Sequence, residues 1–225
     1  MTRELPPRRH DLVWLSPGWP RALVLPLAPE ALREAERWLA RGLPAVASRL
    51  DARAGEEAVA LGIALPPAPE RRRISLSVAP GAVVRVERPL RLAGALASAP
   101  AGFRPKLEAL CVDARALGLS LGVYGSLSWQ HLSGDRYLTE SSDVDVLLEP
   151  RTRAELAGAL ELFRSRAALD RPRLDGELLL EGGRGVSLRE LLANPRRVLV
   201  KSRTSVSLLS LSLALGSLGS PEAAA

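Results

Sequence analysis

The chain has 225 residues, of which 47% are apolar, so it can bury one large core or two small ones and is expected to be globular. Its net charge of +6 rests almost wholly on arginine, which we interpret as a weak attraction to an anionic substrate or partner, with a solvated surface as the simpler alternative. Cys111 is the single cysteine, which excludes an internal disulfide. Because neither a zinc-type Cys/His cluster nor a signal peptide is visible, a reducing cytoplasm is expected.

One apolar segment, residues 198–218, resembles a membrane span in composition only. Lys201 and Arg203 interrupt its start, and the uncharged remainder is shorter than the roughly 20 residues that a bilayer requires. We therefore predict no membrane helix here, but a core strand followed by a tail that packs on its domain or frays.

The first part of the chain, residues 1–100, is predicted to be a smaller α+β domain that binds the substrate or a carrier. Residues 29–41 have the apolar spacing of a helix, and Gly42 follows as its stop signal. Residues 74–78 and 84–86 alternate with a period of two on either side of a turn at residues 79–82, which predicts a β-hairpin. A Pro/Gly/Ala-rich stretch at residues 97–105 marks the expected domain junction.

The second part, residues 101–225, alternates helices and strands, and this order predicts an α+β domain built on a mixed sheet with flanking helices. Helices are predicted at residues 105–117, 152–168 and 187–193. Strands are predicted at residues 119–124, 143–148, 174–181 and 197–201. A helical turn starts at Gly125.

Two aspartates stand out in the strand predicted at residues 143–148. Side chains alternate along a strand, so Asp143 and Asp145 are expected to share one face, roughly 7 Å apart. Two like charges at that spacing invite a cation, and oxygen ligands suit Mg²⁺ or Mn²⁺. The alternative is that Asp143 caps a helix or pairs with Arg151 or Arg153.

Gly125 and Ser126 supply a turn between a strand and a helix. Backbone N–H groups at such a turn bind phosphate, glycine lets an anion approach closely, and the Ser126 hydroxyl adds a donor. Together with the Asp-x-Asp strand, this turn indicates a polyphosphate site. The alternative is a plain turn with Ser126 as the helix N-cap.

These residues carry a resemblance to a known family. Gly125-Ser126, the run from Ser142 to Asp145 and a later RLDGE motif at residues 173–177 resemble the nucleotidyltransferase superfamily. The stretch GSLSWQHLSGDRYLTESSDVDVLL, with the opening RHDLVWL, is more closely similar to the malonate decarboxylase holo-acyl-carrier-protein synthases, also called phosphoribosyl-dephospho-CoA transferases. The interval between Ser126 and Asp143 is longer than in the general superfamily.

The resemblance implies an enzyme with a nucleotidyltransferase-like fold, acting on neither nucleic acid nor membrane. Its members attach the phosphoribosyl-dephospho-CoA part of 2'-(5-triphosphoribosyl)-3'-dephospho-CoA to a serine of the acyl-carrier subunit of malonate decarboxylase and release pyrophosphate. Asp143, Asp145 and Asp175 are then expected to hold two Mg²⁺ or Mn²⁺ ions and to be catalytic, with Asp175 also helping to deprotonate the serine. Glu177 is the rival third carboxylate.

Other residues have weaker assignments. Trp129 and Lys201 are substrate-binding candidates, although Trp129 also suits the core and Lys201 a salt bridge. Basic residues near the acidic strands are expected to steer an acidic carrier: Arg164, Arg166, Arg171 and Arg173. Two rival functions remain open, namely an ATP-dependent adenylyltransferase that uses Asp143 and Asp145, and a non-catalytic binding module.

Overall fold

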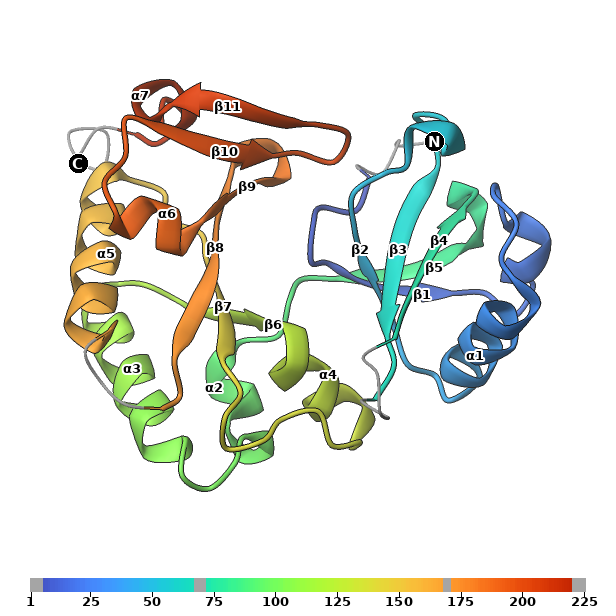
Figure 1. Ribbon diagram of the computed structural model, residues 1–225, viewed down its shortest axis with the longest axis horizontal. Helices are drawn as coiled ribbons and strands as arrows, with labels where there is room; N and C mark the ends of the chain where they lie inside the picture. The colour runs from blue at the N-terminus through green and yellow to red at the C-terminus, as the bar shows by residue number, and fades with distance from the viewer. Residues whose placement is uncertain (1–5, 67–71, 168–170, 220–225) are drawn as a thin grey trace. The chain divides into compact units, whose positions relative to one another are not determined.

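Two separate β-sheets organise the chain, as the computed structural model shows for residues 6–66, 72–167 and 171–219 (Figure 1). Unit 1 comprises Met1–Pro89 and Ser202–Ser205, and unit 2 comprises Leu90–Lys201 and Val206–Ala225. Each unit has its own sheet and buried residues, so the α+β class expected from the sequence is confirmed.

Unit 1 has a five-stranded antiparallel sheet in the order β4-β3-β2-β1-β5. Its strands are β1 (Leu12–Leu15), β2 (Ala45–Ala47), β3 (Val59–Ala64), β4 (Arg73–Val78) and β5 (Val83–Glu87), and its helix is α1 (Pro29–Ala40). The helix predicted at residues 29–41 is thus confirmed, with Ala35 and Trp38 buried. The Trp38 indole donates a 2.9 Å hydrogen bond to the Pro44 carbonyl, which fixes the chain after the helix.

The predicted hairpin in unit 1 is wrong. β4 pairs with β3 and β5 pairs with β1, so the two strands lie at opposite edges of the sheet. The connection between them is a 3-10 turn at Pro80–Ala82. The alternating pattern located both strands correctly, but alternation specifies which face is buried and not which strand is the partner.

Unit 2 has a six-stranded mixed sheet in the order β11-β10-β9-β8-β7-β6, in which only the β7–β8 pair is parallel among the described strands. The strands are β6 (Gly122–Tyr124), β7 (Val144–Leu148), β8 (Leu174–Leu180), β9 (Arg184–Ser187), β10 (Arg197–Lys201) and β11 (Val206–Ser210). The helices are α2 (Leu92–Ala95), α3 (Arg104–Ala116), α4 (Gly125–Ser133), α5 (Arg153–Ala167), α6 (Leu188–Leu192) and α7 (Leu211–Ala214).

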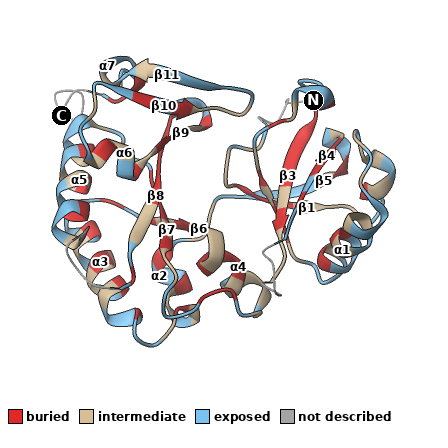
Figure 2. Cartoon of the chain, viewed as in Figure 1, coloured by how far each residue is buried: buried red, intermediate tan, exposed pale blue. Residues whose placement is uncertain are grey.

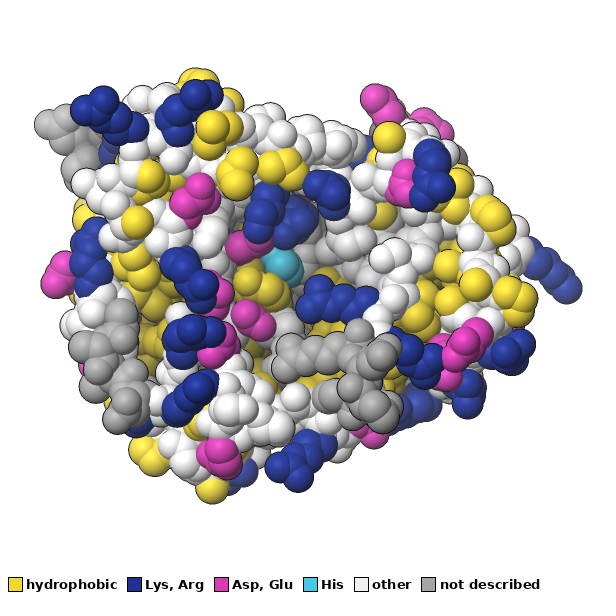
Figure 3. All heavy atoms as spheres, in the orientation of Figure 1, with side chains coloured by type: hydrophobic (Ala, Val, Ile, Leu, Met, Phe, Trp, Pro, Cys, Tyr) yellow, Lys and Arg dark blue, Asp and Glu magenta, His cyan; other side chains and the backbone are white. Residues whose placement is uncertain are grey.

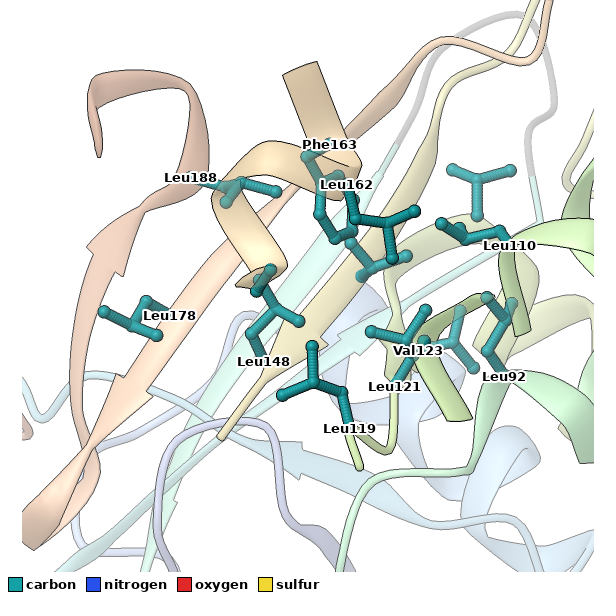
Figure 4. Packing of buried hydrophobic residues seen from close by; sticks show 14 of the residues in the cluster. Leu92, Leu110, Leu119, Leu121, Val123, Leu148, Leu162, Phe163, Leu178 and Leu188 are labelled. Atoms are coloured by element: carbon teal, nitrogen blue, oxygen red, sulfur yellow. The ribbon is translucent and has the colours of Figure 1, made fainter. Parts of the chain in front are cut away.

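Helices α3 and α5 lie side by side against one face of this sheet. Figure 4 shows how their apolar side chains meet those of the strands, with Leu110, Leu162 and Phe163 facing Leu148 and Val123. Buried residues run along β7 and β8, while the outer faces of α3 and α5 are largely exposed (Figure 2). This core holds the inner strands of the sheet in place.

The boundary between the units falls at Pro89 and Leu90, earlier than the junction expected at residues 97–105. Leu92, Ala95 and Phe103 are at most 1% exposed and belong to the core of unit 2. The Pro/Gly/Ala composition of this stretch therefore reflects short helical turns packed on the core, not a linker.

The segment after Lys201, expected to be a tail that packs or frays, forms a further strand and a short helix. β11 pairs with β10 over five residues, and α7 follows with Ala214 fully buried. Of the helices in the described ranges, none combines the length and the apolar character needed to cross a bilayer.

Candidate active site

The predicted acids lie where β7 and β8 begin, next to the start of α4. Asp145 is within β7 and is the register partner of Asp175 in the parallel strand β8. Partners in register point to the same face of a sheet. Asp143, expected inside the strand, lies one residue before β7 instead. The structure thus brings Asp145 and Asp175 together on one face, opposite the face that Val144 and Val146 bury.

Gly125 allows the start of α4 to approach Asp145. Its φ is +63°, and a Cβ atom built there would lie closer than 3.0 Å to the Asp145 carboxylate. Tyr124 is the N-cap and makes no side-chain capping bond, so the alternative of Ser126 as N-cap is wrong; Ser126 is the second residue of the helix. The anion that approaches this glycine in the structure is the protein's own Asp145 carboxylate.

Asp143 is paired with arginine. Arg173 donates from Nη2 and Nε to the two carboxylate oxygens at 2.6 and 3.1 Å, and Arg171 lies 3.9 Å away. These hydrogen bonds to Asp143 raise the pKa of Arg173, and the charge of Asp175 adds to the effect. The alternative that Asp143 pairs with an arginine is therefore observed, but Arg151 and Arg153 are the wrong partners; Arg151 pairs with Glu155 instead.

Asp175 is held by two donors. One oxygen accepts a 2.8 Å bond from the Gly176 N–H, and the other accepts a 3.0 Å bond from Arg189 Nη2 on α6. The side chain remains 32% exposed. Arg189 was not predicted from the sequence, because only the pairing of β9 with β8 brings the residues after β9 beside Asp175.

Glu177, the rival third carboxylate, differs from Asp175 in burial. Its side chain is 5% exposed, and the ammonium of Lys201 lies 3.1 Å from its Oε1. A buried carboxylate needs such a partner, because an uncompensated charge in the interior is costly. Asp175 is thus the more accessible of the two acids, and Lys201, a phosphate-binding candidate, neutralises Glu177.

The remaining candidates are Trp129 on α4 and four arginines on or after α5. Trp129 is only 7% exposed, which fits the packing alternative, and a substrate contact by Trp129 stays a prediction. Acidic and basic side chains lie next to one another over unit 2 where Figure 1 draws β7 and β8 (Figure 3). The four arginines expected to steer a carrier are all in ion pairs: Arg164 with Glu161, Arg166 with Asp113, and Arg171 and Arg173 with Asp143.

The chemistry of the site fits a divalent cation in part. Carboxylates from Asp145 and Asp175 on one face match the one or two acidic ligands that Mg²⁺ takes alongside substrate phosphates. Over the described ranges, the structure contains no group of three His, Cys, Asp or Glu side chains placed to hold a metal ion. A hollow of about 340 Å³, lined by Arg91 and Arg151 among others, lies instead at the far end of β7.

Comparison with known proteins places the chain in a family. The model of the phosphoribosyl-dephospho-CoA transferase MdcG C-terminal domain matches residues 91–212, and that of the N-terminal domain matches residues 8–89. The two matches divide the chain where the structure does. The chain belongs to the phosphoribosyl-dephospho-CoA transferase MdcG family, a family of transferases.

Individual relatives are similar in sequence to this chain along nearly their whole length. A phosphoribosyl-dephospho-CoA transferase from Xanthomonas euvesicatoria is 36% identical over 89% of this chain and 93% of the relative. One from Bradyrhizobium diazoefficiens is 38% identical over 91% and 90%, respectively. One from Azotobacter vinelandii is 32% identical over 90% and 92%. No solved structure matches the chain.

Proposed function

We propose that the chain transfers the phosphoribosyl-dephospho-CoA group from 2'-(5-triphosphoribosyl)-3'-dephospho-CoA to a serine of the apo acyl-carrier subunit of malonate decarboxylase, with release of pyrophosphate. Membership of the family supports the nature of the transferred group. The observation that carries the site assignment is the register of Asp145 against Asp175 beside the start of α4.

The reaction displaces pyrophosphate from phosphorus. The serine oxygen of the carrier forms a bond to the phosphorus nearest the ribose, the bond from that phosphorus to the departing pyrophosphate breaks, and the serine proton must be accepted. Asp175 is proposed as the acceptor of that proton, because its carboxylate is partly exposed at the site. Such a reaction depends mainly on positioning and on neutralising charge.

The residues around Asp145 are proposed to receive the triphosphate. The first N–H groups of α4, from Gly125 and Ser126, carry the positive end of the helix dipole, and the Ser126 hydroxyl is a further donor. Two Mg²⁺ or Mn²⁺ ions bound by Asp143, Asp145 and Asp175 would supply neutralisation of the phosphate charge. Substrate contacts by Trp129 and Lys201 stay predictions.

The test is a reconstituted transfer reaction. The purified chain, the apo carrier, the triphosphoribosyl substrate and Mg²⁺ are combined, and pyrophosphate release and the mass of the carrier are measured. We expect D143A and D145A to lower the rate by about a hundredfold or more with the fold intact by circular dichroism. D51A is a matched control, because Asp51 is also an arginine-paired acid but lies in unit 1.

Two further variants separate the third carboxylate. D175N should lose transfer, whereas E177Q should keep most of it, since Glu177 is bound by Lys201 away from solvent. Full activity of D143A or D145A with metal present would contradict the assignment. Label transferred from ATP to a protein or small molecule, without use of the triphosphoribosyl substrate, would favour an adenylyltransferase.

A further inference from the structure

We propose that Arg173 and Arg189 are exchangeable cations of the site, which neutralise Asp143 and Asp175 in the ligand-free protein and move to the substrate phosphates when a divalent cation takes those carboxylates. The inference rests on the proposed function, because it takes the ligand to be a triphosphate that binds together with a metal. It assigns a role to both arginines and predicts a coupling between two binding events.

The two arginines come from different elements and reach different acids. Arg173 precedes β8 and holds both oxygens of Asp143, while Arg189 on α6 holds one oxygen of Asp175. The backbone brings the pairs close together, since the Val144 N–H donates to the Arg173 carbonyl at 3.0 Å where β7 and β8 begin. The same edge of the sheet therefore carries both acids and both guanidinium groups.

These ion pairs are exposed, and so they are weak enough to exchange. The side chains of Arg173 and Arg189 are 66% and 63% exposed. Water screens such pairs, and many of them contribute little to stability. A long arginine side chain in solvent can also change rotamer without disturbing the core.

The Glu177–Lys201 pair differs from the two arginine pairs because its carboxylate is buried. Glu177 is buried beneath Lys201, and removal of the cation would leave a charge in the interior, which is strongly unfavourable. Lys201 is therefore a fixed cation of unit 2. Burial thus separates Lys201, which must stay, from Arg173 and Arg189, which are able to leave.

Exchange follows from competition and from shape. A divalent cation bound to a carboxylate repels a guanidinium from the same oxygens, because the two cations carry like charge. The displaced guanidinium retains a planar fork of N–H donors, which matches phosphate oxygens. The metal would thus free the arginines that the triphosphate needs, so each ligand should strengthen the binding of the other.

The test measures metal and phosphate binding separately on the full chain. Mn²⁺ binding is followed by electron paramagnetic resonance, with and without inorganic tripolyphosphate, in wild type, R173A, R189A and the double variant. We expect Mn²⁺ alone to bind about twofold to fivefold more tightly in each single variant, since a competing cation is gone. Tripolyphosphate, measured with Mn²⁺ present, should bind about tenfold more weakly.

The opposite directions of the two effects separate exchange from a structural role. R173K and R189K should leave Mn²⁺ affinity near wild type while weakening tripolyphosphate binding, because lysine keeps the charge and loses the fork. R164A is the matched control, since Arg164 is an exposed arginine that pairs with Glu161 on α5, and it should change neither affinity. Melting temperatures verify that each variant is folded.

Either of two results would overturn the inference. If Mn²⁺ affinity is unchanged or weaker in both alanine variants, the arginines do not compete with the metal and the inference is wrong, while transfer by the wild type would leave the proposed function standing. If the wild type binds no Mn²⁺ even with tripolyphosphate, the proposed metal chemistry and the inference are both overturned.

Discussion

Helix α4 begins at Gly125 and is followed by Gly134, and the structure requires glycine at these two positions for different reasons. Gly125 at its start has φ of +63°, and Gly134 at its end has φ of +75°. Both angles lie in the left-handed region, where a Cβ atom costs roughly 1–2 kcal/mol. Only at Gly125 would that Cβ also collide with a carboxylate, that of Asp145; at Gly134 it would meet nothing within 4 Å.

We therefore predict that G125A impairs catalysis and G134A does not. Both variants should lose a similar amount of stability from backbone strain, about 1–2 kcal/mol in urea denaturation. G125A should in addition displace Asp145 and lower the transfer rate by at least about tenfold, because a small misplacement of a catalytic group is costly. Equal transfer rates in the two variants would show that the approach of Gly125 to Asp145 is irrelevant to function.

At the scale of elements, Gly176 sets the spacing between the parallel strands β7 and β8. A Cβ there would lie closer than 3.0 Å to the carbonyl oxygen of Val146 in the neighbouring strand β7. G176A should destabilise unit 2 by about 1–3 kcal/mol, the usual cost of an overpacked interior. G62A is the control, because a Cβ at Gly62 in β3 would have only ordinary contacts at 3.9 and 4.0 Å.

Thermal denaturation followed by circular dichroism compares these two strand variants. G62A should melt within a few degrees of wild type or slightly above it, since alanine is entropically cheaper to order than glycine. A G176A variant that melts with G62A would mean that β7 and β8 separate easily, and the register of Asp145 against Asp175 would then be an unreliable guide to the site.

The start of α5 carries a pH-dependent cap. Thr152 Oγ1 accepts from the Glu155 N–H at 3.1 Å, as in a capping box, but the Glu155 carboxylate accepts at 2.7 Å from the N–H of Arg151, the residue before the N-cap. The bond from the Arg151 N–H is the main reason that the pKa of Glu155 is lowered from its ordinary value of 4.5. Stabilisation by the ionised carboxylate is thus complete above that value and is lost as the pH falls below it.

E155Q and E155A test this cap. At neutral pH, E155A should lose about 1 kcal/mol of stability and E155Q less, because an amide oxygen still accepts the hydrogen bond. The stability gap between wild type and E155Q should shrink as the pH falls below the ordinary pKa of glutamate. A gap that is constant from pH 7 to about pH 3 would show that the charge of Glu155 is irrelevant to the cap.

Elements with strong local patterns were predictable, and those held by distant partners were not. The helices at residues 29–41 and 105–117 have amphipathic spacing and a glycine stop, and the structure confirms them as α1 and α3. β2 and β3 are short and rich in Ala and Gly, and were not assigned, because such strands are stabilised by their neighbours in the sheet. The predicted hairpin of β4 with β5 was wrong for a related reason, because the sequence pattern did not reveal their actual partners β3 and β1.

At the scale of the whole molecule, the acids were visible in the sequence but their surroundings were not. Asp-x-Asp after a Gly-Ser turn was sufficient to suggest the positions on β7 and α4. The arginines that pair with Asp143 and Asp175 depend on how β8, β9 and α6 assemble, and a linear pattern contains no register. The domain boundary was displaced for a related reason, since Leu92 and Phe103 are buried by strands and helices that follow them in the chain.

Steering of a carrier is also a property of the whole molecule. The four arginines expected to attract it are each paired with an acid, and a paired charge contributes little to the field at a distance. The net charge of +6 remains available to attract an acidic protein. We therefore expect the KM for an acidic apo carrier to rise by up to about tenfold between roughly 0.05 and 0.5 M salt, with kcat unchanged.

Two variants that break one ion pair distinguish net charge from the pair itself. R164A and E161A both remove the Arg164–Glu161 contact, in which the charged atoms lie 3.5 Å apart, but R164A lowers the net charge by one unit and E161A raises it by one. If the net field steers the carrier, R164A should raise the KM and E161A should lower it, each by less than about twofold, and the difference should vanish at high salt. A KM that is insensitive to salt, or that shifts in the same direction in both variants, would exclude steering by net charge and leave local contacts to select the carrier.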